Sequence, residues 1–208
     1  MTRTLDFAWR ALVAVLSIAI ALVSYRYLTA SPTRGPGVLA NAFAEPYLVI
    51  HVAGAATALL VSPFQFLARF RNRKSGLHRL VGRVYVTGCL TGGAAGVPLA
   101  LGSTAGPVAA AGFGTLALFW LFTTALGWRR AVERRFAEHR AWMLRSWALT
   151  MAAVTLRLYL PIPPLLGIDF ADGYRAISWL AWVPNLAAVE LYLRWPRRAG
   201  APSGMTAA

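Results

Sequence analysis

Two histidine–arginine pairs stand where a basic stretch of the sequence passes into an apolar one. A further arginine follows each pair, so the two groups are His78, Arg79 and Arg83, then His139, Arg140 and Arg145. Neutral imidazoles on facing helices are favoured axial ligands of haem iron, and arginines pair well with propionates. The first N–H groups of a helix lack backbone partners, so arginines placed there also suit a phosphate, a carboxylate or a lipid headgroup.

These residues leave two functions open. In the first, His78 and His139 hold one haem b and the protein is a membrane electron carrier, with quinone as a candidate exchange partner. His51 is a further candidate cofactor residue, although no second histidine shares its expected depth. In the second, the protein binds or transports an anionic lipid or a small anionic metabolite without catalysis. The sequence has no HExxH, CxxC, GxSxG or P-loop motif, so no catalytic residue is assigned.

The composition places the chain in a membrane. Hydrophobic residues make up 58% of the 208 positions and charged residues 13%, whereas soluble domains average about 25% charged residues. The formal net charge is +14, yet the basic residues cluster in short segments between apolar runs. A nucleic-acid-binding protein would instead spread them along a soluble surface. We therefore expect contact with a lipid bilayer and no nucleic-acid partner.

Six apolar segments are long enough to cross the hydrocarbon core, which takes about 20 residues. They cover residues 9–28, 45–67, 80–102, 108–127, 141–160 and 176–194. The sequence predicts an all-α integral membrane bundle over a single domain, 1–208, with the first span retained and a disordered tail at 199–208. Most arginines fall on one side of this bundle. The positive-inside rule then predicts cytoplasmic termini and a multi-pass protein of the bacterial inner membrane.

Several ionisable residues fall inside these spans, where they are costly and favour a functional interpretation. We expect Glu45, His51 and Arg157 to share one layer near the outer side. Glu190 is the only acid inside the sixth span, and a cation such as Arg145 would offset its desolvation on the inner side. Snorkelling toward the nearest interface is the alternative for both arginines.

Small residues recur at helical spacing in the second and third spans. The third span carries Gly88, Gly92 and Gly96 four residues apart, and the second carries His51, Gly54, Ala55 and Ala58. Small residues on one face let a second helix approach closely. The sequence therefore predicts a helix-packing face, with a planar macrocycle against the same surface as the alternative.

Four motifs occur in order along the chain: "SPFQF" (62–66), "LHRLVGRVYV" (77–86), "HRAWMLRSWALT" (139–150) and "LRLYLP" (156–161). Together they resemble a bacterial family of multi-pass membrane proteins without an established activity, over about residues 45–160. The resemblance implies functional positions at His51, Gln65, His78, Arg79, Gly82, Arg83, His139, Arg140, Trp142, Arg145 and Arg157. Ser62 departs from the glycine of the family pattern. A looser similarity to cytochrome-b-type electron carriers rests on helical hairpins and histidines.

Overall fold

The computed structural model describes residues 2–29, 40–65 and 75–195. The expected tail at 199–208 lies outside the described residues. Within the described ranges the chain is helical and has no strand, which confirms the all-α prediction. The elements are α1 (Thr2–Ser24), η1 (Tyr25–Leu28), α3 (Ala44–Gln65), α5 (Ser75–Leu101), α6 (Pro107–Val132), α7 (Phe136–Thr150), α8 (Ala152–Tyr159), α9 (Ile162–Leu165), α10 (Phe170–Leu180) and α11 (Val183–Arg194).

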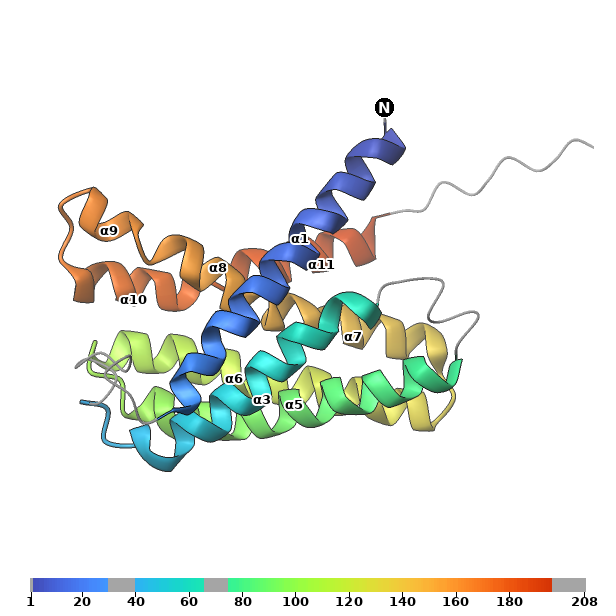
Figure 1. Ribbon diagram of the computed structural model, residues 1–208, viewed down its shortest axis with the longest axis horizontal. Helices are drawn as coiled ribbons and strands as arrows, with labels where there is room; N and C mark the ends of the chain where they lie inside the picture. Colours follow the sequence, from blue (N-terminus) through green and yellow to red (C-terminus); the bar gives the residue numbers. More distant parts are fainter. Residues whose placement is uncertain (1, 30–39, 66–74, 196–208) are drawn as a thin grey trace, which may run out of the picture.

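Six helical stretches among the described residues are long and apolar enough to cross a membrane. They run over Phe7–Leu28, Ala44–Gln65, Gly76–Leu101, Pro107–Val132, Phe136–Leu165 and Phe170–Arg194, in agreement with the predicted spans. Helices α3, α5, α6 and α7 lie side by side, α8 to α11 form a second layer against them, and α1 crosses the bundle diagonally (Figure 1).

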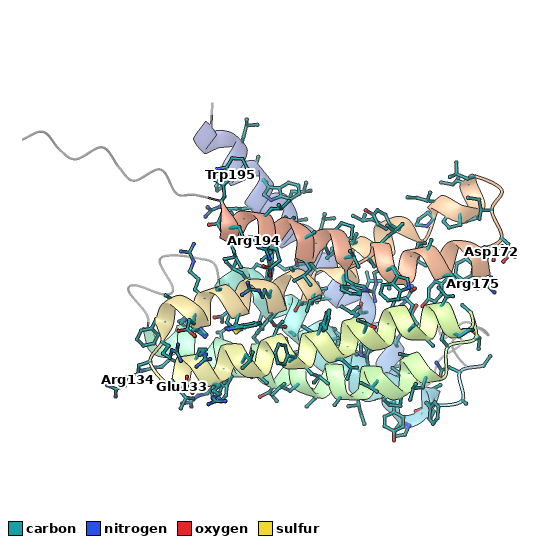
Figure 2. The ribbon with its side chains drawn as sticks, turned by 180° about the vertical axis from the view of Figure 1, so that it is seen from behind. Glu133, Arg134, Asp172, Arg175, Arg194 and Trp195 are labelled. Carbon is teal, nitrogen blue, oxygen red and sulfur yellow. The ribbon has the colours of Figure 1, made fainter. Side chains whose placement is uncertain are left out.

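The two ends of the bundle differ in their charged groups. Glu133 and Arg134 of the α6–α7 turn lie at the same end as Arg194, and Asp172 lies at the other (Figure 2). We call the first the basic end and the second the opposite end. The α6–α7 turn is tight because Arg134 adopts a left-handed conformation, with φ of 58°.

Helices α5 and α7 each begin five residues before the predicted spans, at Ser75 and Phe136. The prediction ended each span at its charged residues, but arginine is a good helix former and the interface hydrates it. The segment between the fifth and sixth predicted spans, residues 161–175, is also partly helical, because it contains α9 and the start of α10. Asp169 caps α10 by accepting hydrogen bonds from the backbone N–H groups of Ala171 and Asp172, at 2.8 and 3.3 Å.

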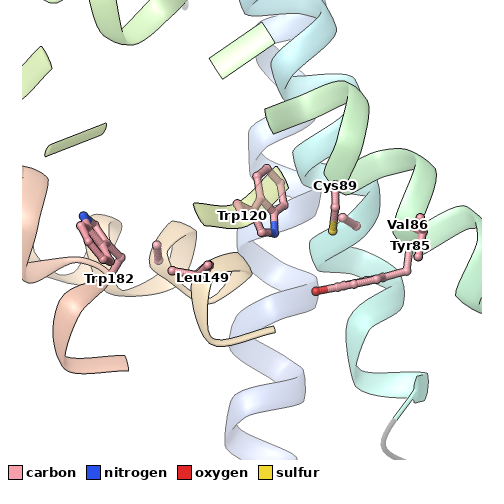
Figure 3. Packing of buried hydrophobic residues seen from close by; sticks show 8 residues of the cluster. Tyr85, Val86, Cys89, Trp120, Leu149 and Trp182 are labelled. Atoms are coloured by element: carbon pink, nitrogen blue, oxygen red, sulfur yellow. The ribbon is translucent and has the colours of Figure 1, made fainter. Parts of the chain in front are cut away.

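The centre of the bundle is filled by large side chains. Its buried cluster includes Tyr85, Val86, Cys89, Trp120, Leu149 and Trp182 (Figure 3). Hydroxyl groups link this cluster across three helices, because the Tyr85 hydroxyl lies 2.8 Å from Oγ1 of Thr150 and 3.1 Å from Oγ of Ser146. The Trp120 indole N–H donates to the same Thr150 hydroxyl at 2.9 Å. These bonds satisfy polar groups that would otherwise be costly in a dry interior.

Candidate functional site

The start of α5 is strongly basic. His78 is the fourth residue of the helix, and Arg79 and Arg83 follow it at positions four residues apart, so both arginines lie on one face. Both arginines are exposed, and the first turn of α5 has no acidic residue. Among the described residues, no ion pair involves either arginine. Two positive charges therefore face outward at this helix start.

The start of α7 has the same register but a different charge balance. His139 is also the fourth residue of its helix, and its backbone N–H already donates to the Arg135 carbonyl at 2.9 Å. Glu138 lies in the first turn and forms ion pairs with Arg130, at 3.1 Å, and with Arg135. The helix thus supplies its own anion where an external anion would bind. Of the two predicted anion sites, the one on α5 has the more favourable electrostatics.

The α6–α7 turn next to this site is neutralised in a similar way. Nε of Arg129 donates to Glu133 at 2.7 Å, and Nη1 of Arg130 donates to it at 2.6 Å. These two hydrogen bonds lower the pKa of the Glu133 carboxyl below its ordinary value. Several basic-end arginines are therefore partners of carboxylates within the chain.

His139 has a defined tautomer. Its Nδ1 lies 2.8 Å from the Gly127 carbonyl oxygen, which only accepts hydrogen bonds, so Nδ1 carries a proton and Nε2 is the nitrogen that could bind a metal. A histidine that binds a metal through Nε2 commonly has this arrangement. Among the described residues there is no cluster of three or more histidine, cysteine or acidic side chains suited to a metal ion.

The two histidines of the pairs occupy equivalent heights. Tyr85 follows His78 by seven residues, and Ser146 follows His139 by the same interval. Seven residues are nearly two turns, or about 10 Å along a helix. Because α5 and α7 run in the same direction and the Tyr85 hydroxyl reaches Ser146, we infer that both histidines lie at a similar depth near the basic end (Figure 1).

The glycine face of α5 is a packing surface, and a helix occupies it. A Cβ atom added to Gly54 of α3 would lie 2.6 Å from the carbonyl oxygen of Gly88 and from the backbone nitrogen of Gly92. A Cβ on Gly88 would lie 2.7 Å from the Gly54 carbonyl oxygen. The two backbones therefore touch, and no macrocycle fits between them.

A groove runs along the outside of this contact. It has a volume of about 420 Å³, and its walls are Ala53, Gly54 and Thr57 of α3 with Arg83, Val84, Thr87, Gly88 and Thr91 of α5. The Thr91 hydroxyl donates to the Thr87 carbonyl at 2.9 Å, and the Thr57 hydroxyl lies 2.8 Å from the hydroxyl of Tyr25. With these hydroxyls satisfied internally, small apolar groups line the groove and Arg83 stands at the end nearer the start of α5.

An ion pair ties the last span to the bundle. Arg145 binds Glu190 through two hydrogen bonds, Nε to Oε1 at 2.5 Å and Nη2 to Oε2 at 3.1 Å. The guanidinium also lies over the Trp142 ring, 4.6 Å from its centroid. The predicted partnership of Arg145 with Glu190 is thus present, and it replaces snorkelling for this arginine. Arg140 is exposed and donates to the Tyr192 hydroxyl at 3.4 Å.

The remaining polar candidates are spread along the bundle. Gln65 ends α3, and a Cβ on Gly82 would lie 3.6 Å from its Oε1 atom, so these two candidates face each other near the basic end. Glu45 is exposed at the start of α3. His51 places Nδ1 2.8 Å from the Gly92 carbonyl oxygen and is therefore also protonated at Nδ1.

Arg157 lies in the opposite half of the bundle, as does His51, and the two are close enough to interact electrostatically. The Arg157 guanidinium donates to the Ala153 carbonyl at 2.9 Å and to Ser24 Oγ at 2.8 Å. Sequence reasoning missed Ser24 and Thr57 as parts of these sites. From sequence alone, a serine or threonine in an apolar span that contributes to a site looks the same as one that only hydrogen-bonds the backbone of its own helix.

Residues 48–193 match a family of membrane proteins over most of the chain. The match begins near the expected residue 45, but it continues past residue 160 and includes the last span, so the expected range was too short. Helix α1 lies before it. Neither curated proteins nor solved structures give a significant match. The chain therefore belongs to the family described as "Predicted membrane protein (DUF2306)".

Proposed function

We propose that this membrane protein binds an anionic phospholipid from the leaflet at its basic end, with the headgroup at Arg79 and Arg83 and one acyl chain in the α3–α5 groove. The observation that carries the proposal is the position of Arg83. It belongs both to the exposed arginine pair and to the wall of the groove. Charge and apolar surface therefore meet at one point, as they do in a phospholipid.

Electrostatics favour α5 over the other helix starts as the headgroup site. Arg129, Arg130 and Arg135 already pair with Glu133 or Glu138, whereas the first turn of α5 has no acid. A basic residue near an anionic membrane surface contributes about 1 kcal/mol to lipid attraction. The two α5 arginines together then favour an anionic over a zwitterionic headgroup by about 2 kcal/mol, or roughly thirtyfold in affinity.

The groove suits a chain because its floor is the Gly54–Gly88 backbone contact. Side chains on either side of that contact are small, so a methylene chain can reach the floor. The basic residues also favour the cytoplasmic side of a bacterial inner membrane for this end, which would make the lipid a component of the inner leaflet.

The test is native mass spectrometry of the purified protein with phosphatidylglycerol and phosphatidylethanolamine at equal concentrations. We expect one phosphatidylglycerol to be retained preferentially. Replacing both arginines, Arg79→Gln with Arg83→Gln, should weaken that preference roughly thirtyfold. Arg134→Gln is the matched control, because Arg134 is exposed at the same end but lies outside the groove.

A groove-filling variant separates a lipid from a free phosphate. Thr87→Trp places an indole in the groove and leaves both arginines in place, so it should abolish lipid retention while sparing inorganic phosphate binding. Equal retention of phosphatidylglycerol by the wild type and the double arginine variant would refute the proposal. If Arg134→Gln lost phosphatidylglycerol to the same extent, the preference would come from the net charge of the protein and not from the two α5 arginines.

A haem-binding redox protein is the second candidate, and the state of His139 favours it. Its Nδ1–H is held by the Gly127 carbonyl, which leaves Nε2 available as an axial ligand. His78 at a similar depth would be the second ligand, with Arg79 and Arg140 near the propionates. A bound haem b would supply one-electron transfer, and quinone is the exchange partner that we would test.

An absorption spectrum tests this candidate directly. The haem-supplied protein should show a Soret band, with sharp α and β bands after reduction by dithionite. His78→Ala and His139→Ala should each remove them, whereas the control His51→Gln should not, since His51 is bonded to Gly92 in the other half. A featureless visible spectrum of the folded wild type would rule out haem and leave the lipid proposal untouched.

A further inference from the structure

We propose that Arg157 is the centre of a second site, in the opposite half of the bundle, that binds the carboxylate of a small organic acid. The site is formed where α8 meets the end of α1. It is distinct from the lipid groove, whose walls are residues of α3 and α5.

The Arg157 side chain turns toward the interior of the bundle, although the opposite end lies in the other direction. Nη1 donates to the carbonyl of Ala153, one turn earlier on the same helix, and Nη2 donates to Ser24 Oγ of α1. α8 runs toward the opposite end, so Ala153 lies on the inward side of Arg157 (Figure 1). A snorkelling arginine would extend the other way, to reach the headgroups. The structure therefore contradicts snorkelling for Arg157.

Among the described residues, no ion pair involves this partly buried guanidinium. Its hydrogen-bond partners are a carbonyl and a hydroxyl, and both are neutral. Three acids of neighbouring helices are engaged elsewhere: Asp172 with Arg175, Asp169 as the cap of α10, and Glu190 with Arg145. An unpaired charge at membrane depth is costly, and a bound anion would remove most of that cost.

The remaining hydrogen-bonding capacity of Arg157 matches a carboxylate. A guanidinium has five N–H groups in a planar fork. Two are used by Ala153 and Ser24, which leaves three for a ligand. A carboxylate takes two of them in parallel, the strongest arrangement for this pair of groups.

The surroundings of Arg157 add positive charge and aromatic groups. Arg26, Tyr27 and Tyr174 are all within electrostatic range of the guanidinium. Tyr174 comes from α10, so three helical elements besides α8 border the site. A singly charged organic acid with a small apolar group matches both the charge and the aromatic surroundings. Its carboxylate would pair with the arginine, and its apolar group would contact the tyrosine rings.

The experiment is thermal unfolding of the purified full-length protein in a mild detergent, with sodium benzoate or sodium acetate against sodium chloride at equal ionic strength. A ligand at a hundredfold excess over its Kd should raise the Tm by roughly 5–10 °C for a chain of this size. Arg157→Gln should abolish the shift. Arg175→Gln is the matched control, since Arg175 is exposed at the same end and outside the site.

Arg157→Lys provides the second measurement, because it keeps the charge and loses the planar fork. We expect it to fold and to raise the Kd of benzoate at least tenfold. A shift in Arg157→Gln as large as in the wild type would overturn the proposal, and so would a wild-type Tm that neither carboxylate changes. Loss of the shift in Arg175→Gln would also contradict it.

Discussion

Gly54→Ala is the sharpest test of how the bundle is held together. The added methyl group would lie 2.6 Å from backbone atoms of Gly88 and Gly92, whereas ordinary contact begins at 3.4 Å. Neither neighbour is a flexible side chain, so α3 and α5 must separate locally by about 0.8 Å to relieve the overlap. A gap of that size forfeits a quarter to a half of each van der Waals contact along the surface, by a rough estimate.

Overpacking of this kind costs about 1–3 kcal/mol, and the better helix propensity of alanine returns roughly 0.5–1 kcal/mol. Gly114→Ala in α6 has the propensity gain without the overpacking cost, because its nearest neighbour, a Cβ of Ala100, is 3.8 Å away and the site is open. The propensity gain is common to both variants. The difference between their free energies of unfolding should therefore be about 1–3 kcal/mol, with Gly54→Ala the less stable.

Unfolding by sodium dodecyl sulfate in mixed micelles, followed by circular dichroism, measures this difference. The lipid proposal adds a second readout, because separation of the helices changes the floor of the groove. We expect Gly54→Ala to retain less phosphatidylglycerol than Gly114→Ala. Equal stability of the two variants would refute the backbone contact described for α3 and α5.

Three further variants probe the polar contacts. Tyr85→Phe removes one hydroxyl from the buried network but leaves Ser146 its hydrogen bond to Thr124. The free energy of unfolding should therefore be about 0.5–1.5 kcal/mol lower than in the wild type. Glu190→Gln should destabilise by about 1–3 kcal/mol, measured in the same titration, and its effect should vanish in an Arg145→Met background. The lowered pKa of Glu133 means that the unfolded chain takes up its proton first as the pH falls. The stabilisation from this residue is therefore fully present above pH 4.5 and is lost progressively as the pH falls from there through the folded-state pKa. Glu133→Gln should then flatten the loss of Tm between pH 5 and the folded-state pKa; an unchanged acid profile would contradict the Arg129–Glu133 contact.

Hydropathy and charge were enough to predict the membrane architecture, because a span of about 20 apolar residues has few alternatives in a bilayer. The same reasoning missed α9 and α10. Their sequence combines proline, glycine and aspartate, which usually mark a linker. Here Pro163 stands in the first turn of α9, where a missing N–H is harmless, and Asp169 is a cap.

The site residues were predictable in type but less so in partnership. The pairing of Arg145 with Glu190 followed from the scarcity of acids, since a buried carboxylate needs a cation and few were in reach. The difference between the α5 and α7 helix starts did not follow. That difference depends on which carboxylates of the α6–α7 turn form ion pairs with which arginines, and the conformation of the turn at Arg134 decides those pairs.

The contact of Gly54 with Gly88 also bears on how the protein is made. α3 and α5 are neighbours in the sequence, and their backbones meet without side chains between them. Helices that insert one after another can dock as soon as both are in the bilayer. We expect this hairpin to form while the later spans are still being synthesised. A bulky residue at Gly54 would then act during biosynthesis, and its main effect in cells would be degradation of the nascent chain.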